Sequence, residues 1–492
     1  MSASTTATVT DTGIRLQPDH SRVITRLFVA GREEVGPGDS RAGAVVQRVL
    51  ELTELEAEQG VAELDHRFAH RHRHLHDIFR RHADAVVGRL DGSAAELSTA
   101  RRLMLGAAFT NEYSVEGAAL CNPSAVAFGS TDESGSAPFV LSTRGVGEGH
   151  RSSIGFRTGA VSATGEIRMD RAAPYPTAGD VTPALHDRAV FHAKLAEIDD
   201  DRENAAFVLD SLPDQFDITQ LDERIAALEA DVATRRNTAQ TVRHLRDVAA
   251  SSYSVEFPAA TYISERVLWP HAPAESHGME DARFVRFVDD DGAVIYYATY
   301  TAFDGVNIAQ HMLRTDDFRT FCAIPLAGPA AVGKGLALFP RKVGGRYAAL
   351  SRSDRESNTI AFSDDMLCWA EAESLQTPSL PWEMLQLGNC GSPIETDRGW
   401  LVLTHGVGPM RTYAIGALLL DLHRPERVLA RTLEPILAPA SDQRDGYVPN
   451  VVYSCGGFAH GDTLVLPYGV ADQSIAIATL SVNELIASMH RD

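Results

Sequence analysis

Ten consecutive residues, 275–284, combine three acidic side chains with a histidine, a glycine and an arginine. The acids are Glu275, Glu280 and Asp281, and an apolar, aromatic run follows Arg283 at once. Carboxylates this close together cost electrostatic energy unless they bind a ligand or take part in chemistry. A solvated polar loop is the alternative, and this segment alone does not distinguish the two.

Repetition along the chain indicates the fold that must position these acids. Hairpin-like turns recur at intervals of about 50–60 residues, and each precedes an apolar strand: Asp291-Gly292, Gly344-Gly345, Arg398-Gly399 and Gly461-Asp462. A second motif, residues 315–321, is echoed by residues 363–369. Repeated units of short strands and glycine turns are typical of a β-propeller, whereas a β-sandwich predicts no such period. With further strands between residues 121 and 165, we predict an all-β five-bladed β-propeller.

Two helical segments interrupt this β pattern. Residues 40–90 carry apolar side chains at helical spacing, with a start signal at Pro37-Gly38-Asp39-Ser40, and residues 217–250 do the same without Pro or Gly. We therefore predict added helices in an N-terminal segment and in an insertion. The predicted parts are a tail and helical segment (1–110), the first propeller strands (111–184), the helical insertion (185–252) and the remaining blades (253–492).

A histidine-rich stretch lies inside the first helical segment. His66/His70 and His72/His76 have the i, i+4 spacing that can bind a metal, but arginines lie between them and no acid does. Cations repel a metal ion, so we favour a basic helix face, solvated or at an interface, and predict no metal site. The sequence does not say whether the helical additions form a lid or a subunit interface in a homo-oligomer.

Composition narrows the function. The 492 residues are 44% hydrophobic and 23% charged, with a formal net charge of -21. That charge argues against binding to nucleic acids or anionic membranes, because both attract basic proteins. Five scattered cysteines without CxxC spacing predict neither disulfides nor zinc. Residues 1–13 lack the pattern of a signal peptide and no run is apolar enough to span a membrane, so we expect a cytoplasmic protein with a short disordered tail.

Polar clusters occur at equivalent places in successive repeats. They are Glu280-Asp281 with Arg283, Phe339-Pro340-Arg341-Lys342, Gly391-Ser392-Pro393 with His405 and Arg411, and Tyr447-Val448-Pro449-Asn450. A glycine-rich loop before the insertion adds Arg144, His150 and Arg151. Acids from one blade and cations from the next two suit a reaction that needs a proton donor beside an anion clamp. Each residue also has a structural alternative: Arg341 as a surface charge, His405 as a core histidine and Asn450 as a turn former.

Residues 275–480 resemble glycoside hydrolase family 130, the β-mannoside phosphorylases and related β-mannosidases. The matching segments are 278–283, 300–305, 337–342, 400–407, 415–421 and 448–452, and the similarity extends more weakly to Asn122-Pro123 and Arg144. The resemblance implies an inverting enzyme that cleaves a β-linked mannosyl unit, with an oligosaccharide or disaccharide as substrate. It implies no cofactor, and inorganic phosphate as co-substrate.

The resemblance also implies roles for individual residues. Asp281 matches the general acid, with Glu280 beside it, and protonation of the glycosidic oxygen passes through a sugar hydroxyl while phosphate attacks the anomeric carbon. Substrate-binding candidates are Asn122, Arg144, Arg151, Arg283, Tyr300, Asp304, His405, Tyr447 and Asn450. Phosphate-binding candidates are Arg341, Lys342, Arg352 and Arg411.

Some positions depart from the family pattern. Ala282 replaces a proline, Val306 follows Asp304-Gly305 where phosphorylases often carry a basic residue, and Ser351 precedes Arg352 where they often carry histidine. Fewer phosphate ligands favour water as nucleophile, and hydrolysis needs a base, for which Glu383 and Glu395 are the candidates. Phosphorolysis is therefore the first hypothesis and an inverting β-mannosidase the second. A non-catalytic sugar-binding propeller is the third, although it has no need of Glu280-Asp281 beside cations.

Overall fold

The structure is a computed structural model that describes residues 7–29, 41–87, 97–200, 203–231 and 237–491. It divides into two compact units. The larger comprises residues 1–18, 116–172 and 179–492, and the smaller comprises residues 19–115 and 173–178. The start signal predicted at Pro37–Ser40 lies outside the described residues.

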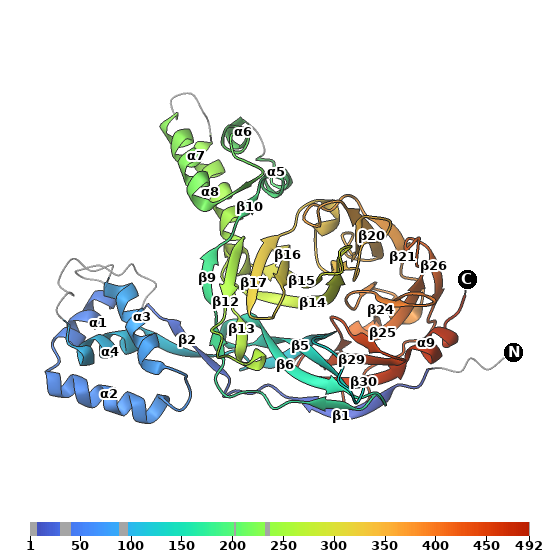
Figure 1. The fold of residues 1–492 in the computed structure, drawn as a ribbon, viewed down its shortest axis with the longest axis horizontal. Coiled ribbons are helices and arrows are strands. Elements are labelled where there is room, and N and C mark those ends of the chain that lie inside the picture. The colour runs from blue at the N-terminus through green and yellow to red at the C-terminus, as the bar shows by residue number, and fades with distance from the viewer. Residues whose placement is uncertain (1–6, 30–40, 88–96, 201–202, 232–236, 492) are drawn as a thin grey trace. The chain divides into compact units, whose positions relative to one another are not determined.

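The larger unit is built mainly of antiparallel strands, which confirms the predicted mainly-β fold (Figure 1). Most strands fall into five groups of four, within which each strand pairs with the next. In chain order these are β4 (Ala119–Ala127), β5 (Ala137–Val146), β6 (Ser152–Val161) and β7 (Ile167–Met169); β14 (Gly278–Val288), β15 (Val294–Phe303), β16 (Ile308–Thr315) and β17 (Thr320–Pro325); β18 (Ala337–Leu338), β19 (Tyr347–Ser351), β20 (Asn358–Ser363) and β21 (Glu373–Gln376); β22 (Gln386–Asn389), β24 (Gly399–Gly408), β25 (Thr412–Leu420) and β26 (Val428–Arg431); and β27 (Val452–Tyr453), β29 (Thr463–Val470), β30 (Ser474–Ser481) and β1 (Thr10–Leu16).

Short strands supplement these groups. β12 (Tyr253–Glu256) pairs with β17 and with β9 (Asp180–Pro183), so both extend the second group. β13 (Arg266–Leu268) pairs with β6, β23 (Ile394–Thr396) with β24, and β28 (Phe458–His460) with β29. A single parallel pairing of Gly278 with Ser152 joins the second group to the first.

The predicted turns and repeat are confirmed. Asp291-Gly292, Gly344-Gly345, Arg398-Gly399 and Gly461-Asp462 fall in hairpins of successive groups. In the repeated motif, Asp317 Oδ1 accepts hydrogen bonds from two following backbone N–H groups, and Asp365 Oδ1 does the same 48 positions later. The residues after these aspartates, Phe318 and Met366, both have positive φ (55° and 66°), so the two segments form the same turn.

Strand β1 corrects the predicted N-terminal tail. Residues 10–13 were expected to be disordered, yet they belong to a strand that pairs antiparallel with β30. Ile14 and Leu16 pack against a buried cluster that includes Phe139, Leu141 and Ile477. The fifth group thus combines the early strand β1 with strands from residues 452–481. The Ser/Thr-rich composition around β1 gave no sign of this long-range pairing.

The helical insertion forms its own small core within the larger unit. Its helices are α5 (Arg188–Glu197), α6 (Glu203–Leu209), α7 (Ile218–Ala230) and α8 (Thr238–Ala250), with the short strands β10 (His186–Asp187) and β11 (Gln215–Phe216). Asp187 and Asp217 cap α5 and α7 by accepting hydrogen bonds from first-turn N–H groups. Helix α9 (Val482–Ser488) lies after β30 and packs its apolar side chains on the fifth group.

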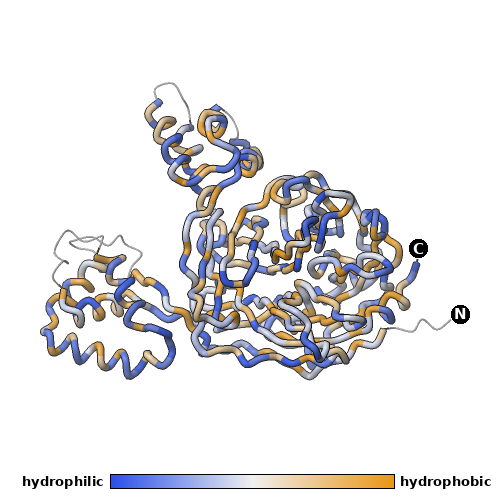
Figure 2. Tube along the Cα trace, in the orientation of Figure 1, coloured by the Kyte–Doolittle hydropathy of each residue, from blue (hydrophilic) through white to orange (hydrophobic). Residues whose placement is uncertain are grey.

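The smaller unit is helical with one two-stranded sheet. It contains α1 (Arg41–Leu50), α2 (Glu54–Phe68), α3 (Leu75–Val87), α4 (Thr99–Ala108), β2 (Val23–Leu27), β3 (Thr110–Ser114) and β8 (Thr177–Ala178). Figure 2 shows α2 as largely hydrophilic, and only Ala57 of that helix is buried. Across the described residues, no helix is both long and apolar enough to cross a membrane.

The helical segment predicted over residues 40–90 contains three helices, with breaks at two places in its described part. Thr53 starts α2 with a capping box, and α2 ends at Phe68 before α3 begins at Leu75. His66/His70 and His72/His76 therefore do not share a helical face. His72 instead lies buried with Nε2 2.6 Å from Glu112 Oε1, and His76 Nε2 lies 2.7 Å from Asp65 Oδ1.

The pairing of β1 with β30 gives a test of the fold. Replacing both Ile14 and Leu16 by Asp places charges against the apolar cluster beneath β1, and we expect a loss of about 2–4 kcal/mol in the free energy of unfolding. Thr10→Asp, on an exposed position of the same strand, is the control and should change stability little. Urea denaturation measures both, and equal effects would contradict the burial assigned to β1.

Candidate active site

The three acids of residues 275–284 have different surroundings. Glu275 lies before β14 and has a structural role, whereas Glu280 and Asp281 lie within β14 and form the candidate site. Glu275 is fully buried, and its carboxylate accepts hydrogen bonds from the hydroxyls of Tyr253 and Tyr300 and from the backbone N–H of His271 and Ala272. One carboxylate thus accepts hydrogen bonds from all four of these donors. Glu275 ties the loop before β14 to the neighbouring strands.

Asp281 sits on a backbone irregularity. The pairing of β14 with β15 shifts register between Glu280 and Arg283, and Asp281 has a φ of 55°. Asn122 stands at the matching bulge of β4, with a φ of 46°. Such left-handed residues cost energy in a strand and recur at functional sites. The Asn122 Nδ2 group donates to Asp281 Oδ1, so the two irregular residues meet side chain to side chain.

Three cations surround the acid pair. Arg144 of β5 donates to Glu280 Oε1 at 2.5 Å and to Asp281 Oδ1 at 3.4 Å, and Lys334 Nζ lies 2.7 Å from Glu280 Oε2. Arg283 donates to the backbone carbonyl of Asp281 and to the hydroxyl of Tyr453 in β27. The acids and their cations come from two strand groups and the loop before β18, and Tyr453 adds a contact from a third group.

These cations set the protonation of Asp281. Burial would raise the pKa of its carboxyl, but the charges of Lys334, Arg144 and Arg283 and the hydrogen bond from Asn122 together lower the pKa to about 2. Asp281 is therefore ionised at neutral pH when no ligand is present. An anion that neutralises the cations would remove this lowering and leave the effect of burial.

His405 and Arg352 extend the site on its other side. His405 of β24 is buried, its ring packs edge-on against Tyr453 at 4.9 Å, and its Nε2 lies 3.2 Å from Arg352 Nη1. Burial, then the charges of Arg352 and Arg283, hold the pKa of His405 well below its usual range. The neutral ring accepts from Arg352 through Nε2, since its Nδ1 faces the Asn389 carbonyl at 3.1 Å.

Four atoms in this cluster have no partner among the described residues although they are shielded from solvent. They are Asn122 Oδ1, Arg144 Nε, Arg283 Nε and Arg352 Nε. Buried polar groups are normally hydrogen-bonded. Three cationic donors and one amide acceptor without a partner fit a site that takes up a polar, partly anionic ligand. No group of three or more His, Cys, Asp or Glu in the described part of the chain is placed to hold a metal ion.

Asp472, in the turn between β29 and β30, completes the charged set. Burial raises the pKa of its carboxyl to about 6, with Asp281 and Glu280 adding to the rise and Arg144 and Arg411 opposing it. Asp472 also has a φ of 48°. It is the acid of the cluster that changes charge near neutral pH.

Further predicted residues lie in exposed or partly exposed loops. Arg411 is exposed with its guanidinium 6.0 Å from the Tyr413 ring, and Arg151 lies 5.8 Å from the Trp269 ring. Tyr447, 46% exposed, bonds His150 through its hydroxyl at 2.6 Å. Asn450 has a φ of 63° and its carbonyl accepts from Tyr413, which fits the turn-forming alternative.

The structure removes the predicted phosphate ligands Arg341 and Lys342 from the cluster. Arg341 makes a two-point ion pair with Glu395, with N–O distances of 2.9 and 2.6 Å, and lines a separate cavity at the later ends of β4 and β14. Lys342 pairs with Asp289 and Asp290 in the β14–β15 turn. Arg341 and Lys342 follow the C-terminal end of β18, whereas Lys334 of the acid cluster precedes its N-terminal end.

The predicted bases and two substrate-binding candidates also have structural partners. Glu383 is fully buried and accepts hydrogen bonds from the backbone N–H groups of Ser379 and Leu380, and Glu395 is paired as described. Tyr300 is buried on Glu275. Asp304 accepts from the N–H groups of Val306 and Asn307 and caps its own turn. These contacts give Glu383, Glu395 and Tyr300 structural partners, and their roles as bases or ligand residue stay predictions.

Four residues of the cluster were not predicted from the sequence: Lys334, Asn389, Tyr453 and Asp472. For Lys334 the sequence did carry a pattern, Gly333-Lys334-Gly335, which is typical of a tight loop, and both glycines have positive φ. Asn389 Nδ2 donates to the Gly335 carbonyl at 2.6 Å and so fixes that loop. Asp472 had no signal beyond a hairpin turn.

Glu275 offers a test of the structural assignment. Glu275→Gln keeps the shape but places an amide N–H₂ against hydroxyl and N–H donors, and we expect a loss of about 2–3 kcal/mol in the free energy of unfolding. Tyr300→Phe, which removes one of the donors, should cost about 1 kcal/mol. Chemical denaturation compares them; a neutral Glu275→Gln would contradict the network.

Asp472 gives a pH test. Because its pKa is raised to about 6 from the ordinary 3.8, folded Asp472 binds more protons between these values, so its contribution to wild-type stability falls as pH rises from about 4 to 6. Asp472→Asn should remove this fall and gain relative to wild type up to pH 6. Asp462 is the matched control: its Ser481 and Asn483 hydrogen bonds lower its pKa, so Asp462→Asn should lose relative stability as pH rises. Thermal unfolding at several pH values measures both; parallel curves for wild type and Asp472→Asn would contradict the assignment.

Comparison with known proteins identifies the family. Residues 235–491 match glycoside hydrolase family 130, described as beta-1,4-mannooligosaccharide phosphorylase. The chain is 36% identical over 238 residues to a 1,2-beta-oligomannan phosphorylase of Thermoanaerobacter sp. (strain X514), which covers 45% of this chain and 75% of the relative. It is 29% identical over 357 residues to a beta-1,2-mannobiose phosphorylase of Listeria innocua, which covers 70% and 94%. The structure of a Listeria innocua beta-1,2-mannobiose phosphorylase in complex with beta-1,2-mannobiose aligns with a TM-score of 0.45 at 22% identity over 77% of this chain and 93% of that one. The chain belongs to glycoside hydrolase family 130, the family of the β-mannoside phosphorylases.

Proposed function

We propose that this enzyme cleaves β-linked mannosides by inverting phosphorolysis and releases mannose 1-phosphate. The observation that carries the proposal is the buried pair Glu280 and Asp281 held among Arg144, Lys334 and Arg283. An acid and an anion-binding set in one site are the two requirements of the reaction. The phosphorylase activities of the curated relatives support the same reading.

In the proposed reaction a phosphate oxygen attacks the anomeric carbon on the face opposite the glycosidic bond. That C–O bond breaks, and its electron pair goes to the leaving sugar oxygen. The proton for that oxygen comes from Asp281, passed through a sugar hydroxyl as the family resemblance implies. Phosphate arrives already charged and needs no base, so one carboxylic acid suffices.

The cations of the site explain how Asp281 obtains its proton. Without a ligand, Lys334, Arg144 and Arg283 keep the pKa of Asp281 at about 2, too low for a proton donor at neutral pH. A phosphate bound to these cations would offset their charge, and burial then raises the pKa. Phosphate binding thus prepares the acid that the reaction needs.

We assign phosphate to the cationic donors that lack a partner, and the mannosyl unit to the polar groups around them. Arg144 and Arg352 keep buried Nε groups for an anion, and Lys334 adds a point charge. Asn122, through its free Oδ1, is a candidate for a sugar hydroxyl. Arg151, Tyr447 and Asn450, from the loops, stay proposed substrate-binding residues, and Arg411 stays a proposed phosphate ligand.

The rival is hydrolysis by the same site. It requires a base, and both predicted candidates have other partners: Glu383 accepts hydrogen bonds from backbone N–H groups and Glu395 pairs with Arg341. Asp472 is the carboxylate of the cluster that could act on water, because its pKa of about 6 leaves it ionised at neutral pH. Phosphate dependence separates the two reactions.

We also propose that the five strand groups form a five-bladed propeller with the site at its centre. Four of the five groups contribute a site residue from their first strand: Asn122, Asp281, Asn389 and Tyr453. The remaining group contributes Arg352, which directly follows β19. This arrangement is the support for a central channel. Helices α1 to α4 and helices α5 to α8 are proposed as additions to it.

The first substrate we propose is a β-1,2-linked mannoside. Curated relatives from Thermoanaerobacter and Listeria that act on β-1,2 linkages support it, while the family description names β-1,4-linked mannooligosaccharides. β-1,4-Mannobiose is therefore the second substrate to test.

The decisive assay incubates the enzyme with β-1,2-mannobiose with and without phosphate. We expect mannose 1-phosphate and mannose only when phosphate is present, and Asp281→Asn should lower turnover by about 10²–10⁴-fold, the usual contribution of a general acid. Glu395→Gln is the control, because Glu395 pairs with Arg341 outside the cluster and should leave turnover intact. Free mannose at the same rate without phosphate would instead identify a hydrolase.

A further inference from the structure

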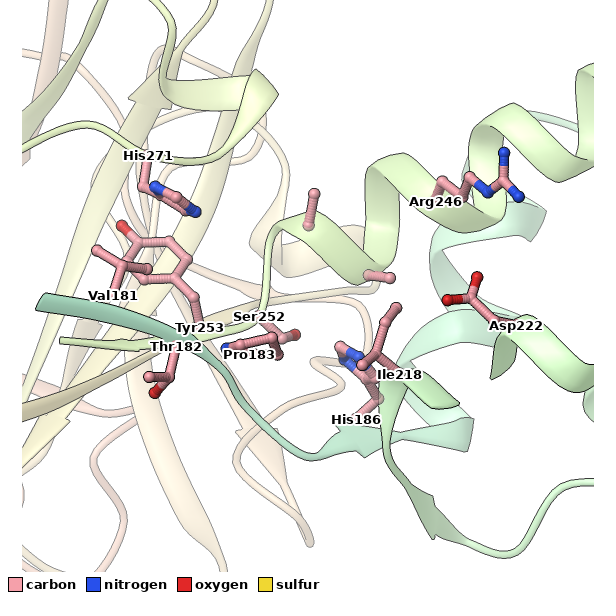
Figure 3. Close-up of a pocket in the computed structure, with 12 residues that line it drawn as sticks. Val181, Thr182, Pro183, His186, Ile218, Asp222, Arg246, Ser252, Tyr253 and His271 are labelled. Atoms are coloured by element: carbon pink, nitrogen blue, oxygen red, sulfur yellow. The ribbon is translucent and has the colours of Figure 1, made fainter. Parts of the chain in front are cut away.

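A second cavity lies away from the acid pair, where the helical insertion joins the strands. It has a volume of about 440 Å³ and is lined by β9, β10, α7, α8, the start of β12 and His271 (Figure 3). Small-molecule sites usually enclose about 300–1,000 Å³. The cavity is therefore large enough for a small ligand.

The cavity is lined by a buried histidine that lacks hydrogen bonds. His186 is 2% exposed, and neither of its ring nitrogens has a partner among the described residues. Its ring packs against Phe191 and Phe216, each with a centroid distance of 5.4 Å. Burial lowers the pKa of His186, so the ring is neutral and offers one donor and one acceptor. An imidazole with both functions unused is costly unless a ligand engages it.

The remaining polar groups define the charge of that ligand. Asp222 of α7 and Arg246 of α8 stand at one end of the cavity, and the hydroxyls of Thr182 and Ser252 line its wall. One carboxylate and one guanidinium together favour neither an anion nor a cation. Apolar side chains such as Val181, Pro183 and Ile218 supply the rest of the lining. Donors and acceptors together with apolar side chains suit a neutral ring that carries several hydroxyls.

From these contacts we propose that the cavity is a second, non-catalytic binding site for a neutral saccharide, anchored by His186 and Arg246. If the proposed function is right, an oligomannoside is the natural source of that sugar, and this choice of source rests on it. The site itself rests on the cavity and its polar groups. Tyr253, which lines the cavity, donates its hydroxyl to Glu275, so one residue borders both the cavity and the loop that leads into β14.

The test uses the full chain carrying Asp281→Asn, so that β-mannosides bind without being consumed. Calorimetric titration with β-1,2-mannobiose in phosphate-free buffer should reveal a second site beside the catalytic one. Arg246→Ala should weaken that second site roughly threefold to tenfold or more, the loss expected for one hydrogen bond. Arg243→Ala is the matched control, an exposed arginine of the same helix that does not line the cavity.

A further variant tests the histidine directly. His186→Phe keeps an aromatic ring between Phe191 and Phe216 but removes both nitrogens, and it should weaken the second site with little loss of stability. If this variant fails to fold, Arg246→Ala still decides. A single site, or a second site that neither variant weakens, would overturn the proposal.

Other probes identify the source of the sugar. Binding of β-1,2-mannobiose but not maltose at the second site assigns it to the enzyme's own substrate, and binding of both assigns it to neutral saccharides in general. Occupation of the second site by mannose 1-phosphate in preference to the neutral sugars would overturn the neutral ligand. A protein that turns over no β-mannoside yet binds maltose in an Arg246-dependent way would refute the proposed function and leave this inference standing.

Discussion

The site depends on two buried carboxylates that cannot be neutralised locally. Glu280 and Asp281 are adjacent in one strand and are less than one-tenth exposed, and Arg283 is the cation that their own strand supplies. Arg144 comes from the neighbouring group, Lys334 from a loop and Asn122 from the bulge of β4. Removing any one of these partners weakens the compensation of the buried charges, which ties the positions of these chain segments to one another. The electrostatics of the acid pair therefore constrain the packing of the surrounding strands.

Backbone strain serves the same arrangement. Asn122 and Asp281 both take left-handed φ angles at bulges, where each strand pairing slips. Asn and Asp tolerate this conformation better than branched or aromatic residues do. The bulge turns the side chain out of the alternation of the strand, so that Asn122 Nδ2 reaches Asp281 Oδ1. In both strands the irregularity directs the side chain that the site uses.

Local signals in the sequence predicted the repeating parts well. The glycine turns and the Asp317 and Asp365 motifs are made by hydrogen bonds within a few residues, so a short segment specifies them. β1 was missed because its partner β30 lies more than 450 residues away. Local signals also failed to place Arg341. It lies only a few residues from Lys334 in sequence, but the two residues flank opposite ends of β18. Composition does not tell which end of a strand faces a ligand.

Isolated acids were the least predictable residues. Glu275, Glu383 and Glu280 look alike in sequence, yet Glu275 and Glu383 bind backbone N–H groups three or four residues back, while Glu280 binds Arg144 and Lys334. A carboxylate satisfied by its own loop is a structural element, and one satisfied by cations from other segments is held in a state that a ligand can change. That difference separates the acids that stabilise this fold from the acids that we propose for its chemistry. The pKa of Asp281 is lowered by the charges of Lys334, Arg144 and Arg283 and by the Asn122 hydrogen bond, so we expect it to rise when a bound anion offsets those charges.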